Sequence, residues 1–378
     1  MHRITITDLL NGLERNRPFQ FENLARARII HERNLINDFL DAGGHAYGFS
    51  TFFGHLDVHA IRPEDSLDLL KAHLVGSPTP LSDSQSRAIT LIKLCQLGQG
   101  GSGLSPETFD VVLSAVNTEI SIDLDASYGS GDVVPGAWWV RSVLGEFPDL
   151  ERGDLIALIN GSFIPEGLLL SAVNPLNTAF SAIRRSAGKA QEFLQKRVDQ
   201  GVQLPVSLRD IAPLEKELSD GLGQLMWSIE ESANRQSFNP TFTFEGPEGA
   251  NGETTVSVVS NSSFLNFECL AAVRRVGVSM SVAAGYALAM IKHLSSTLET
   301  ESNINHGVEW VQVPKVATSY YDNLMDTLTF SGSTAQWASG GTEDISDFLL
   351  AEAQKVQRAV SLLEKLVHLL DQCVDSIG

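Results

Sequence analysis

The sequence predicts an all-α protein built from long helices packed side by side. Apolar residues recur at helical spacing through residues 175–198, 264–294 and 342–377. Residues 238–259 differ, because Thr-Phe-Thr-Phe and Thr-Thr-Val-Ser-Val-Val flank a segment with Gly, Pro and Asn, which predicts a small hairpin or an extended excursion. We therefore expect a helical bundle with one extended insertion.

Shorter helices separated by breaks are expected in the first part of the chain. Residues 1–40 mix apolar and charged side chains as a helix does, and residues 41–53 are a loop rich in glycine and aromatic residues. A glycine-rich break at 98–103 precedes Pro106, which opens a helix because proline at the first helical position loses no hydrogen bond. The expected segments are helices at 65–75, 84–97 and 106–121, with helix starts at 140–144 and 154–159.

Long helices dominate the remainder. They are expected at 175–198, 211–234, 264–294 and 342–377, the last as one helix or a pair, with a loop at 302–313. No repeat or linker divides the chain, so we expect one helical domain over 1–378, with a loop-rich part at 1–135 and a central bundle at 136–378.

The composition excludes some functions. The formal net charge of −19 repels phosphate backbones, so nucleic acid is not an expected partner. Cys95, Cys269 and Cys373 are widely separated and odd in number, which predicts buried thiols in a reducing cytoplasm and gives no metal-binding spacing. The N-terminus has no apolar signal region. No run is expected to span a membrane; 273–294 comes closest, but Arg274, Arg275 and Lys292 interrupt it.

The segment Gly129-Ser130-Gly131 has a chemistry of its own. The Gly131 nitrogen can attack the Gly129 carbonyl carbon, since glycine lets the backbone fold tightly enough for a five-membered ring to close. Loss of two waters, the second from Ser130, leaves a methylidene-imidazolone, an electrophile that ordinary side chains do not supply. The alternative is an ordinary Gly-Ser-Gly loop.

Several ordered motifs resemble those of the aromatic amino acid ammonia-lyases and aminomutases. The match runs from residue 46 to residue 346. Its segments, in order, are Ala46-Tyr47-Gly48-Phe49-Ser50-Thr51-Phe52-Phe53-Gly54, Ala72-His73 with Gly76, Gly100-Gly101-Ser102-Gly103, Gly129-Ser130-Gly131-Asp132 with Pro135, Leu158-Ile159-Asn160-Gly161-Ser162, Ser207-Leu208-Arg209 and Glu343-Asp344-Ile345-Ser346. The resemblance implies a helical-bundle fold of the ammonia-lyase type and a 4-methylidene-imidazol-5-one formed from residues 129–131, with no external cofactor and no metal.

The chain also departs from the family pattern. Gly129 replaces the family alanine, whose methyl group is outside the ring. Val206 replaces a tyrosine, Ile345 a histidine and Phe52 a glycine. The stretch between Asn160 and Arg209 and the part after Glu343 are shorter than in typical members. These departures indicate a divergent member.

The resemblance implies catalytic roles for four sites. Ser130, within Gly129–Gly131, would supply the methylidene carbon, and Tyr47 would be the base that removes the β-proton. Asn160 would hydrogen-bond the ring oxygen or the substrate amine, the alternative being a turn before Gly161. Glu343 would accept the amine proton or orient the amine, the alternative being an acid at a helix N-terminus beside Thr342.

Three further residues would bind the substrate. Arg209 would hold its carboxylate through two hydrogen bonds, although a surface arginine is the alternative. His73 would contact its side chain, and a histidine there goes with a polar ring; the alternative is a core histidine. Phe264 lies where the family has an aromatic residue next to the site, so the resemblance implies that it contacts the substrate. The alternative is that it packs in the core as part of an apolar helix.

Three functions remain open at this point. The first is an ammonia-lyase or 2,3-aminomutase for an aromatic or heteroaromatic L-amino acid. The second is a different elimination or addition on a larger or carrier-tethered substrate, suggested by Val206 and the shortened middle. The third is a pseudoenzyme scaffold without the ring. Family members share active sites between subunits, so the resemblance implies a homotetramer, which the apolar stripes on 264–294 and 356–370 also favour.

Overall fold

Two compact units make up the structure, a computed structural model that describes residues 3–14, 22–62, 65–197, 203–246, 254–302, 305–329 and 334–377. Unit 1 comprises Met1–Ser171, Ser228–Leu270 and Gly332–Ala353. Unit 2 comprises Ala172–Trp227, Ala271–Ser331 and Gln354–Gly378. Both units therefore draw on distant parts of the sequence, and four long helices contribute residues to both units.

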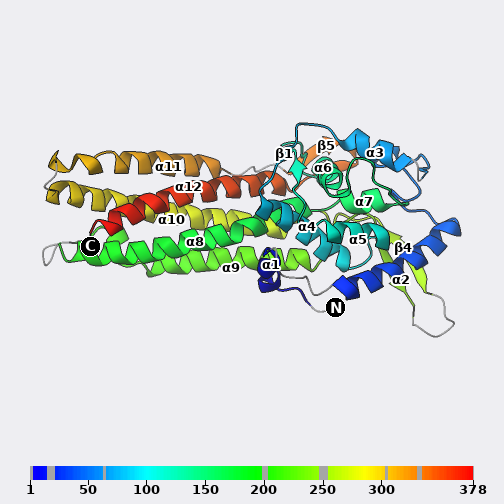
Figure 1. Ribbon diagram of the computed structural model, residues 1–378, viewed down its shortest axis with the longest axis horizontal. Coiled ribbons are helices and arrows are strands. Elements are labelled where there is room, and N and C mark those ends of the chain that lie inside the picture. Colours follow the sequence, from blue (N-terminus) through cyan, green and yellow to red (C-terminus); the bar gives the residue numbers. More distant parts are fainter. Residues whose placement is uncertain are drawn as a thin grey trace. The chain divides into compact units, whose positions relative to one another are not determined.

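Unit 1 holds most of the shorter helices and all of the strands that the structure describes (Figure 1). Its complete helices are α1 (Ile6–Gly12), α2 (Glu22–Asp41), η1 (Gly54–Leu56), α3 (Asp65–His73), α4 (Asp83–Gly98), α5 (Pro106–Ser114), α6 (Val133–Leu144), α7 (Asp154–Ile159) and η4 (Ser339–Gly341). Helix α4 is buried along most of its length and begins at a capping box, in which Ser82 and Gln85 each bond the other's backbone N–H. It is the central helix of this unit's core.

Among the described residues, three small antiparallel sheets complete unit 1. Strands β3 (Thr241–Glu245) and β4 (Thr255–Val259) pair with Thr241 opposite Val259. The other pairs are β1 (Thr79–Pro80) with β2 (Ser121–Ile122), and β5 (Ala335–Ala338) with β6 (Glu343–Ile345). The hairpin expected within 238–259 is thus present, with 247–253 outside the described residues.

Unit 2 is a bundle in which long helices run side by side (Figure 1). It contains most of α8 (Phe163–Gln195), α9 (Ala212–Ala233), α10 (Phe267–Glu301) and α12 (Leu349–Asp375), with η2 (Val206–Leu208), η3 (Asn305–Trp310) and α11 (Val313–Thr327). Helix α10 contacts three neighbours, through hydrogen bonds from Ser279 to Glu217, from Ser281 to Met325 and between Ser295 and Cys373. It is the central helix of the bundle.

The expected all-α fold is confirmed, and four element boundaries are wrong. Residues 140–144 are the C-terminal end of α6, which begins at Val133, and not the start of a helix. The final helix begins at Leu349 and not at 342, because 343–345 pair as strand β6. Helix α5 ends at Ser114 and not near 121, where the chain pairs as β2. Helix α8 begins at Phe163, well before Pro175, since the apolar residues of its first turns are buried and tertiary packing tolerates a proline inside the helix.

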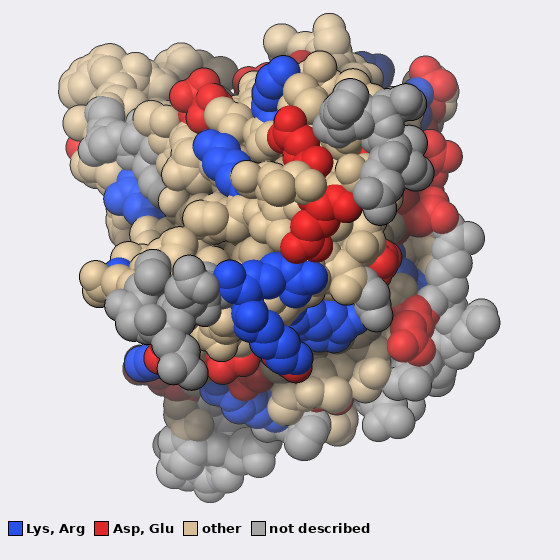
Figure 2. Space-filling view, turned by 90° about the vertical axis from the view of Figure 1, so that its left-hand side faces the viewer, with Lys and Arg blue, Asp and Glu red and all other residues tan. Residues whose placement is uncertain are grey.

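Apolar stretches and cysteines lie in the interior. Among the residues described, Asp154–Gln195 is long and apolar enough to span a bilayer, so the expectation that no segment could do so is wrong. Its most apolar part is completely buried inside the protein, as in a core helix. The three cysteines are buried and unpaired, as expected. The molecular face drawn in Figure 2 carries basic and acidic side chains next to one another, so the net charge of −19 does not make this face uniformly acidic.

Candidate functional site

The Gly129-Ser130-Gly131 segment is a tight, buried turn in unit 1. Gly129 and Gly131 have φ angles of 80° and 70°, in the left-handed region that glycine adopts without steric cost. Ser130 between them is 3% exposed. Asp132 follows with φ 46° at the start of helix α6, a conformation that is strained for a residue with a Cβ. The sequence therefore folds here as a compact loop held against a helix N-terminus.

Residues 346–348, which connect strand β6 to helix α12, hold the Gly129 end of the turn. The Gly129 carbonyl accepts hydrogen bonds from the Ser346 hydroxyl and, at 3.2 Å, from the Asp347 N–H. A Cβ on Gly129 would lie 1.9 Å from Ser346 Oγ and 3.0 Å from Phe348 Cδ1. Glycine is therefore required here, which gives a physical reason for the departure from the family alanine.

Tyr47 and Glu343 lie near this turn, together with Tyr128, which sequence reasoning did not select. The Tyr128 hydroxyl is 3.5 Å from Glu343 Oε1, and the Ser339 hydroxyl donates to Oε2 at 3.2 Å. Burial raises the pKa of Glu343, and these two hydroxyls lower it in part. Burial and the nearby Glu343 charge raise the pKa of Tyr128. Because Glu343 belongs to β6, it is not the helix N-terminal acid that the sequence left open.

The phenol of Tyr47 is anchored by the loop that carries it. Its oxygen accepts a hydrogen bond from the Gly54 N–H at 2.7 Å. Burial raises the pKa of Tyr47, and the Gly54 bond opposes that effect because it favours the phenolate. The Tyr47 ring lies 6.2 Å from the Phe53 ring, which lies 5.7 Å from the ring of His73. Phe53 thus connects two of the residues selected from the sequence.

His73 is half-buried at the end of α3. Its Nδ1 lies 2.8 Å from the Leu69 carbonyl oxygen, which fixes the ring orientation. If Nδ1 carries the proton for that bond, Nε2 is the free acceptor. The ring is therefore oriented but not enclosed in the core.

Asn160 and Phe264 lie beside Gly131 at the other end of the turn. A Cβ on Gly131 would be 3.0 Å from Asn160 Nδ2 and 3.7 Å from Phe264 Cδ2. Asn160 Oδ1 accepts from the Asn239 N–H at 3.1 Å, so its amide group is held with Nδ2 toward the turn. Phe264 is half-buried and precedes helix α10, so the expectation of a helical position is wrong.

Two buried ionisable groups beside the turn have strongly shifted pKa values. Burial raises the pKa of Asp132 to about 7, although the Ser127 hydroxyl donates to this carboxylate. Burial lowers the pKa of Lys93 to about 7; its Nζ donates to the Asn160 carbonyl at 2.9 Å and lies 4.6 Å above the Phe163 ring. Such shifts concentrate at functional sites, because burial of ionisable groups is costly.

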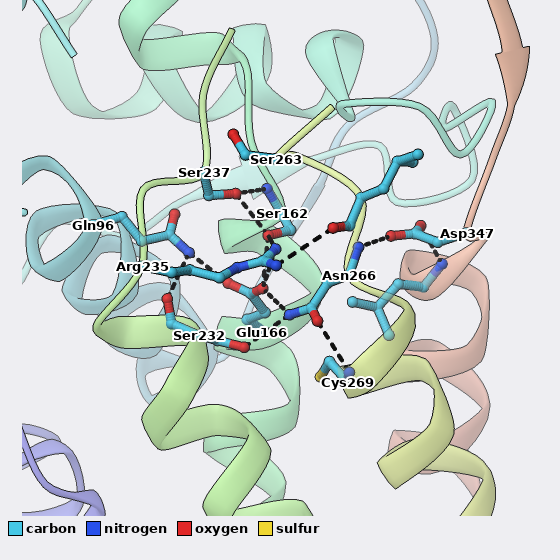
Figure 3. A network of polar contacts seen from close by, with 12 residues as sticks. Gln96, Ser162, Glu166, Ser232, Arg235, Ser237, Ser263, Asn266, Cys269 and Asp347 are labelled. Atoms are coloured by element: carbon cyan, nitrogen blue, oxygen red, sulfur yellow. Dashed lines mark hydrogen bonds and ion pairs between the residues drawn. The ribbon is translucent and has the colours of Figure 1, made fainter. Parts of the chain in front are cut away.

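A buried polar network adjoins the site (Figure 3). Glu166 is fully buried and accepts hydrogen bonds from Gln96 at 2.6 Å, Ser162 at 2.6 Å and Asn266 at 2.7 Å, with Arg235 at 3.5 Å. The Asn266 N–H donates in turn to Asp347 Oδ2 at 2.7 Å. The network therefore connects the Glu166 carboxylate on α8 to the residue that follows Ser346.

Arg209 is not among the residues that unit 1 brings together. It belongs to unit 2, is exposed, and donates from Nε to the Leu204 carbonyl at 2.8 Å. This environment agrees with the surface role that the sequence left open.

Unit 1 thus gathers most of the residues selected from the sequence: Tyr47, His73, residues 129–131, Asn160, Phe264 and Glu343. Sequence reasoning missed four neighbouring residues. Tyr128 directly precedes the glycine turn, and Ser346 ends the Glu-Asp-x-Ser motif, so adjacency to selected residues was the available signal. Asp347 and Lys93 carry no comparable signal, because both are recognised through burial and contacts alone. Among the described ranges, no cluster of three or more His, Cys, Asp or Glu side chains is suited to a metal ion.

The fold is that of the ammonia-lyases and aminomutases. Histidine ammonia-lyase from Trypanosoma cruzi superposes with a TM-score of 0.81 at 18% identity, over 98% of this chain and 82% of that one. Phenylalanine aminomutase from Pantoea agglomerans superposes with a TM-score of 0.79 at 13% identity, over 98% of this chain and 88% of that one. At such identities the likeness concerns the fold.

Sequence comparison adds a family relationship. Residues 4–158 match the model of the aromatic amino acid lyase family, which confirms the resemblance of the motifs between residues 46 and 135. Histidine ammonia-lyase from Burkholderia multivorans is 32% identical over 143 residues, 36% of this chain and 28% of that protein. The aligned segment therefore spans less than a third of this curated relative. The family match includes Tyr47, His73 and residues 129–131, whereas the other selected residues lie beyond residue 158: Asn160, Arg209, Phe264 and Glu343.

Proposed function

We propose that this chain is an ammonia-lyase or 2,3-aminomutase for an L-amino acid with an aromatic or heteroaromatic side chain. The observation that carries the proposal is the buried Gly129-Ser130-Gly131 turn beside Tyr47, Tyr128 and Glu343. Glycines in the left-handed region flank a buried serine, and glycine gives the backbone the freedom that closure of a five-membered ring needs.

The residues present fit a methylidene-imidazolone made from this segment. Gly129 leaves room for Ser346, and Gly131 leaves room for the Asn160 amide. When formed, the ring would supply an electrophilic carbon that takes up the substrate amine and makes it a better leaving group. No external cofactor and no metal enters the proposal.

Tyr47 would remove the β-proton of the substrate. A phenolate is a sufficient base only if hydrogen bonds stabilise its charge, and the Gly54 N–H at 2.7 Å supplies one such bond. Glu343 would accept a proton from the substrate ammonium group, because only the neutral amine can react with the ring. Burial raises the pKa of Glu343 toward neutral pH, and a proton acceptor is most efficient when its pKa is close to the working pH.

The remaining residues would orient the substrate. Asn160 Nδ2 points toward the turn and would donate to the ring oxygen or contact the amine. His73 would contact the substrate ring through Nε2, and Phe264 would pack beside it. Arg209 would bind the substrate carboxylate, a role that only the sequence motif supports. The assembled protein would be a cytoplasmic homotetramer.

Mass spectrometry and a substrate screen would test this function. The intact chain should be lighter than its sequence mass by two waters, whereas Ser130→Ala, which cannot lose the second water, should be lighter than its own sequence mass by at most one. Phenylalanine, tyrosine and histidine would be offered, with ultraviolet detection of the conjugated acid and chromatographic detection of β-amino acids. An unmodified mass in folded protein would contradict the proposal and favour the pseudoenzyme alternative.

A second function is favoured by the shortened middle of the chain and by Val206, which is 70% exposed. A larger or carrier-tethered amino acid would then be the substrate of a related elimination or addition. A chain that carries the mass change and is inactive on free amino acids would favour this alternative.

A further inference from the structure

The carbonyl oxygen of Gly129 lies in a two-donor pocket formed by residues of another segment. The Ser346 hydroxyl is 2.5 Å from this oxygen, and the Asp347 N–H is 3.2 Å from it. Ser346 is completely buried, so water does not compete for the hydroxyl. This carbonyl is also the group that must be attacked if the proposed ring is to close.

The direction of the Ser346 hydroxyl is set by its neighbours. Its oxygen accepts a hydrogen bond from the Phe348 N–H at 3.1 Å, which leaves the hydroxyl proton for the Gly129 oxygen. Phe348 has φ 51°, a conformation that costs energy for a residue with a Cβ and that brings its N–H to Ser346. A strained residue thus orients the donor.

The Asp347 N–H is held by the polar network of Figure 3. The Asp347 carboxylate accepts from the Asn266 N–H at 2.7 Å and from the Leu349 N–H at 2.9 Å. Asn266 is itself bound to Glu166 at 2.7 Å. Helix α12 begins at Leu349, so the positive end of its dipole also lies at this pocket.

We propose that Ser346 and the Asp347 N–H form an oxyanion hole for the self-cyclisation of residues 129–131. When the Gly131 nitrogen bonds to the Gly129 carbon, the carbonyl π electrons move onto oxygen, and the two donors stabilise that negative charge. The oxygen then leaves as water with the protons of the Gly131 and Ser130 nitrogens. The Ser130 Cα proton and hydroxyl leave as the second water. No oxidant or reductant is needed.

This inference rests on the proposed function, because it assumes that the ring forms. It adds that this chain contains a catalytic residue for making its own electrophile, Ser346, which is distinct from the residues proposed for the substrate. It also gives the close approach of Ser346 to Gly129 a chemical purpose, because an alanine at 129 would push that hydroxyl away.

Timed mass spectrometry of newly made protein tests the inference. The full chain would be made by cell-free synthesis, stopped at intervals and digested with trypsin, which releases 94–141 as one peptide because no Lys or Arg lies between Lys93 and Arg141. Ser346→Ala should slow the loss of two waters by about 100-fold or more, the usual effect of losing one oxyanion donor. Ser346→Thr, which keeps the hydroxyl, should mature at close to the wild-type rate.

Ser86→Ala is the matched control. Ser86 is a buried serine of unit 1 whose hydroxyl accepts from the Ile120 N–H at 3.2 Å, so the variant also loses one hydrogen bond to a backbone group. It should mature at the wild-type rate. Equal maturation rates for wild type and a folded Ser346→Ala would overturn the inference and leave the proposed function intact, whereas an unmodified wild-type chain would overturn both.

A crystal structure of Ser130→Ala gives a second test that does not depend on the folding of a Ser346 variant. This chain cannot lose the second water, so its turn would keep an exocyclic methyl at position 130. If the ring has not closed, Ser346 Oγ and the Asp347 nitrogen should both lie within hydrogen-bond distance of the carbonyl oxygen of residue 129. If the ring has closed and this oxygen has left as water, both donors should point at the position that it occupied. A carbonyl that points away from both donors would refute the inference.

Discussion

The Tyr128 hydroxyl and Glu343 Oε1 lie 3.5 Å apart, although 215 positions separate the two residues in the chain. This contact joins the residue before the glycine turn to strand β6. It also lowers the pKa of Glu343, against the larger effect of burial. The protonation state of Glu343 therefore depends on Tyr128, a residue to which no sequence motif assigned a role.

Tyr128→Phe should shift the acid limb of the pH–rate profile to higher pH. The variant removes a hydrogen bond that favours the carboxylate, so the pKa of Glu343 should rise further. The unprotonated acceptor would then be reached only at higher pH. The measurement is turnover of the identified amino acid against pH, with Tyr286→Phe, a half-buried tyrosine of unit 2, as the control. An unchanged acid limb would exclude Glu343 as the titrating group.

Tyr47→Phe should lower turnover by roughly 100- to 10,000-fold, the range for loss of a general base. The fold should persist, because phenylalanine keeps the ring that lies 6.2 Å from Phe53. The intact mass should still show the loss of two waters, which separates a defect in substrate chemistry from a defect in ring formation. Wild-type turnover in this variant would assign the β-proton to another base.

Gly129→Ala should destabilise the fold by about 1–3 kcal/mol, because the added methyl meets Ser346 Oγ at 1.9 Å. The cost should be smaller in a Ser346→Gly background, where that hydroxyl is gone. Urea unfolding of both single variants and the double variant would measure the coupling, on the order of 1 kcal/mol. All chains would carry Ser130→Ala, so that loss of the second water does not contribute. Simple additivity would show that the two positions are not in contact.

Asp132→Asn should flatten the pH dependence of stability between about pH 4 and pH 7. Burial raises the pKa of Asp132 from 3.8 to about 7, so the folded chain binds this proton more tightly than the unfolded chain. That contribution is fully present below pH 3.8 and is lost as the pH rises through about 7. Denaturant unfolding across this range would show wild type losing stability relative to Asp132→Asn. The exposed Asp149→Asn should follow wild type.

Local pattern alone was enough to predict most of the helices and the site-bearing loops, although several helix boundaries were wrong. The apolar stripe of 264–294 predicted α10, and Thr-Phe-Thr-Phe predicted β3, because side-chain periodicity follows directly from backbone geometry. The motif around Gly129-Ser130-Gly131 was also readable, since it depends on residues that are consecutive in the chain.

Contacts between distant segments were decided by tertiary structure. Glu343 reads as the start of a helix, but pairing of β6 with β5 makes it part of a strand and brings it to Tyr128. Gly129 reads as a tolerated replacement for alanine, whereas Ser346 makes it necessary. Neither contact leaves a periodic signal, because 217 positions separate Gly129 from Ser346 and only the folded chain brings them together. Burial, which shifts the pKa of Asp132 and Lys93, is likewise a property of the packed chain.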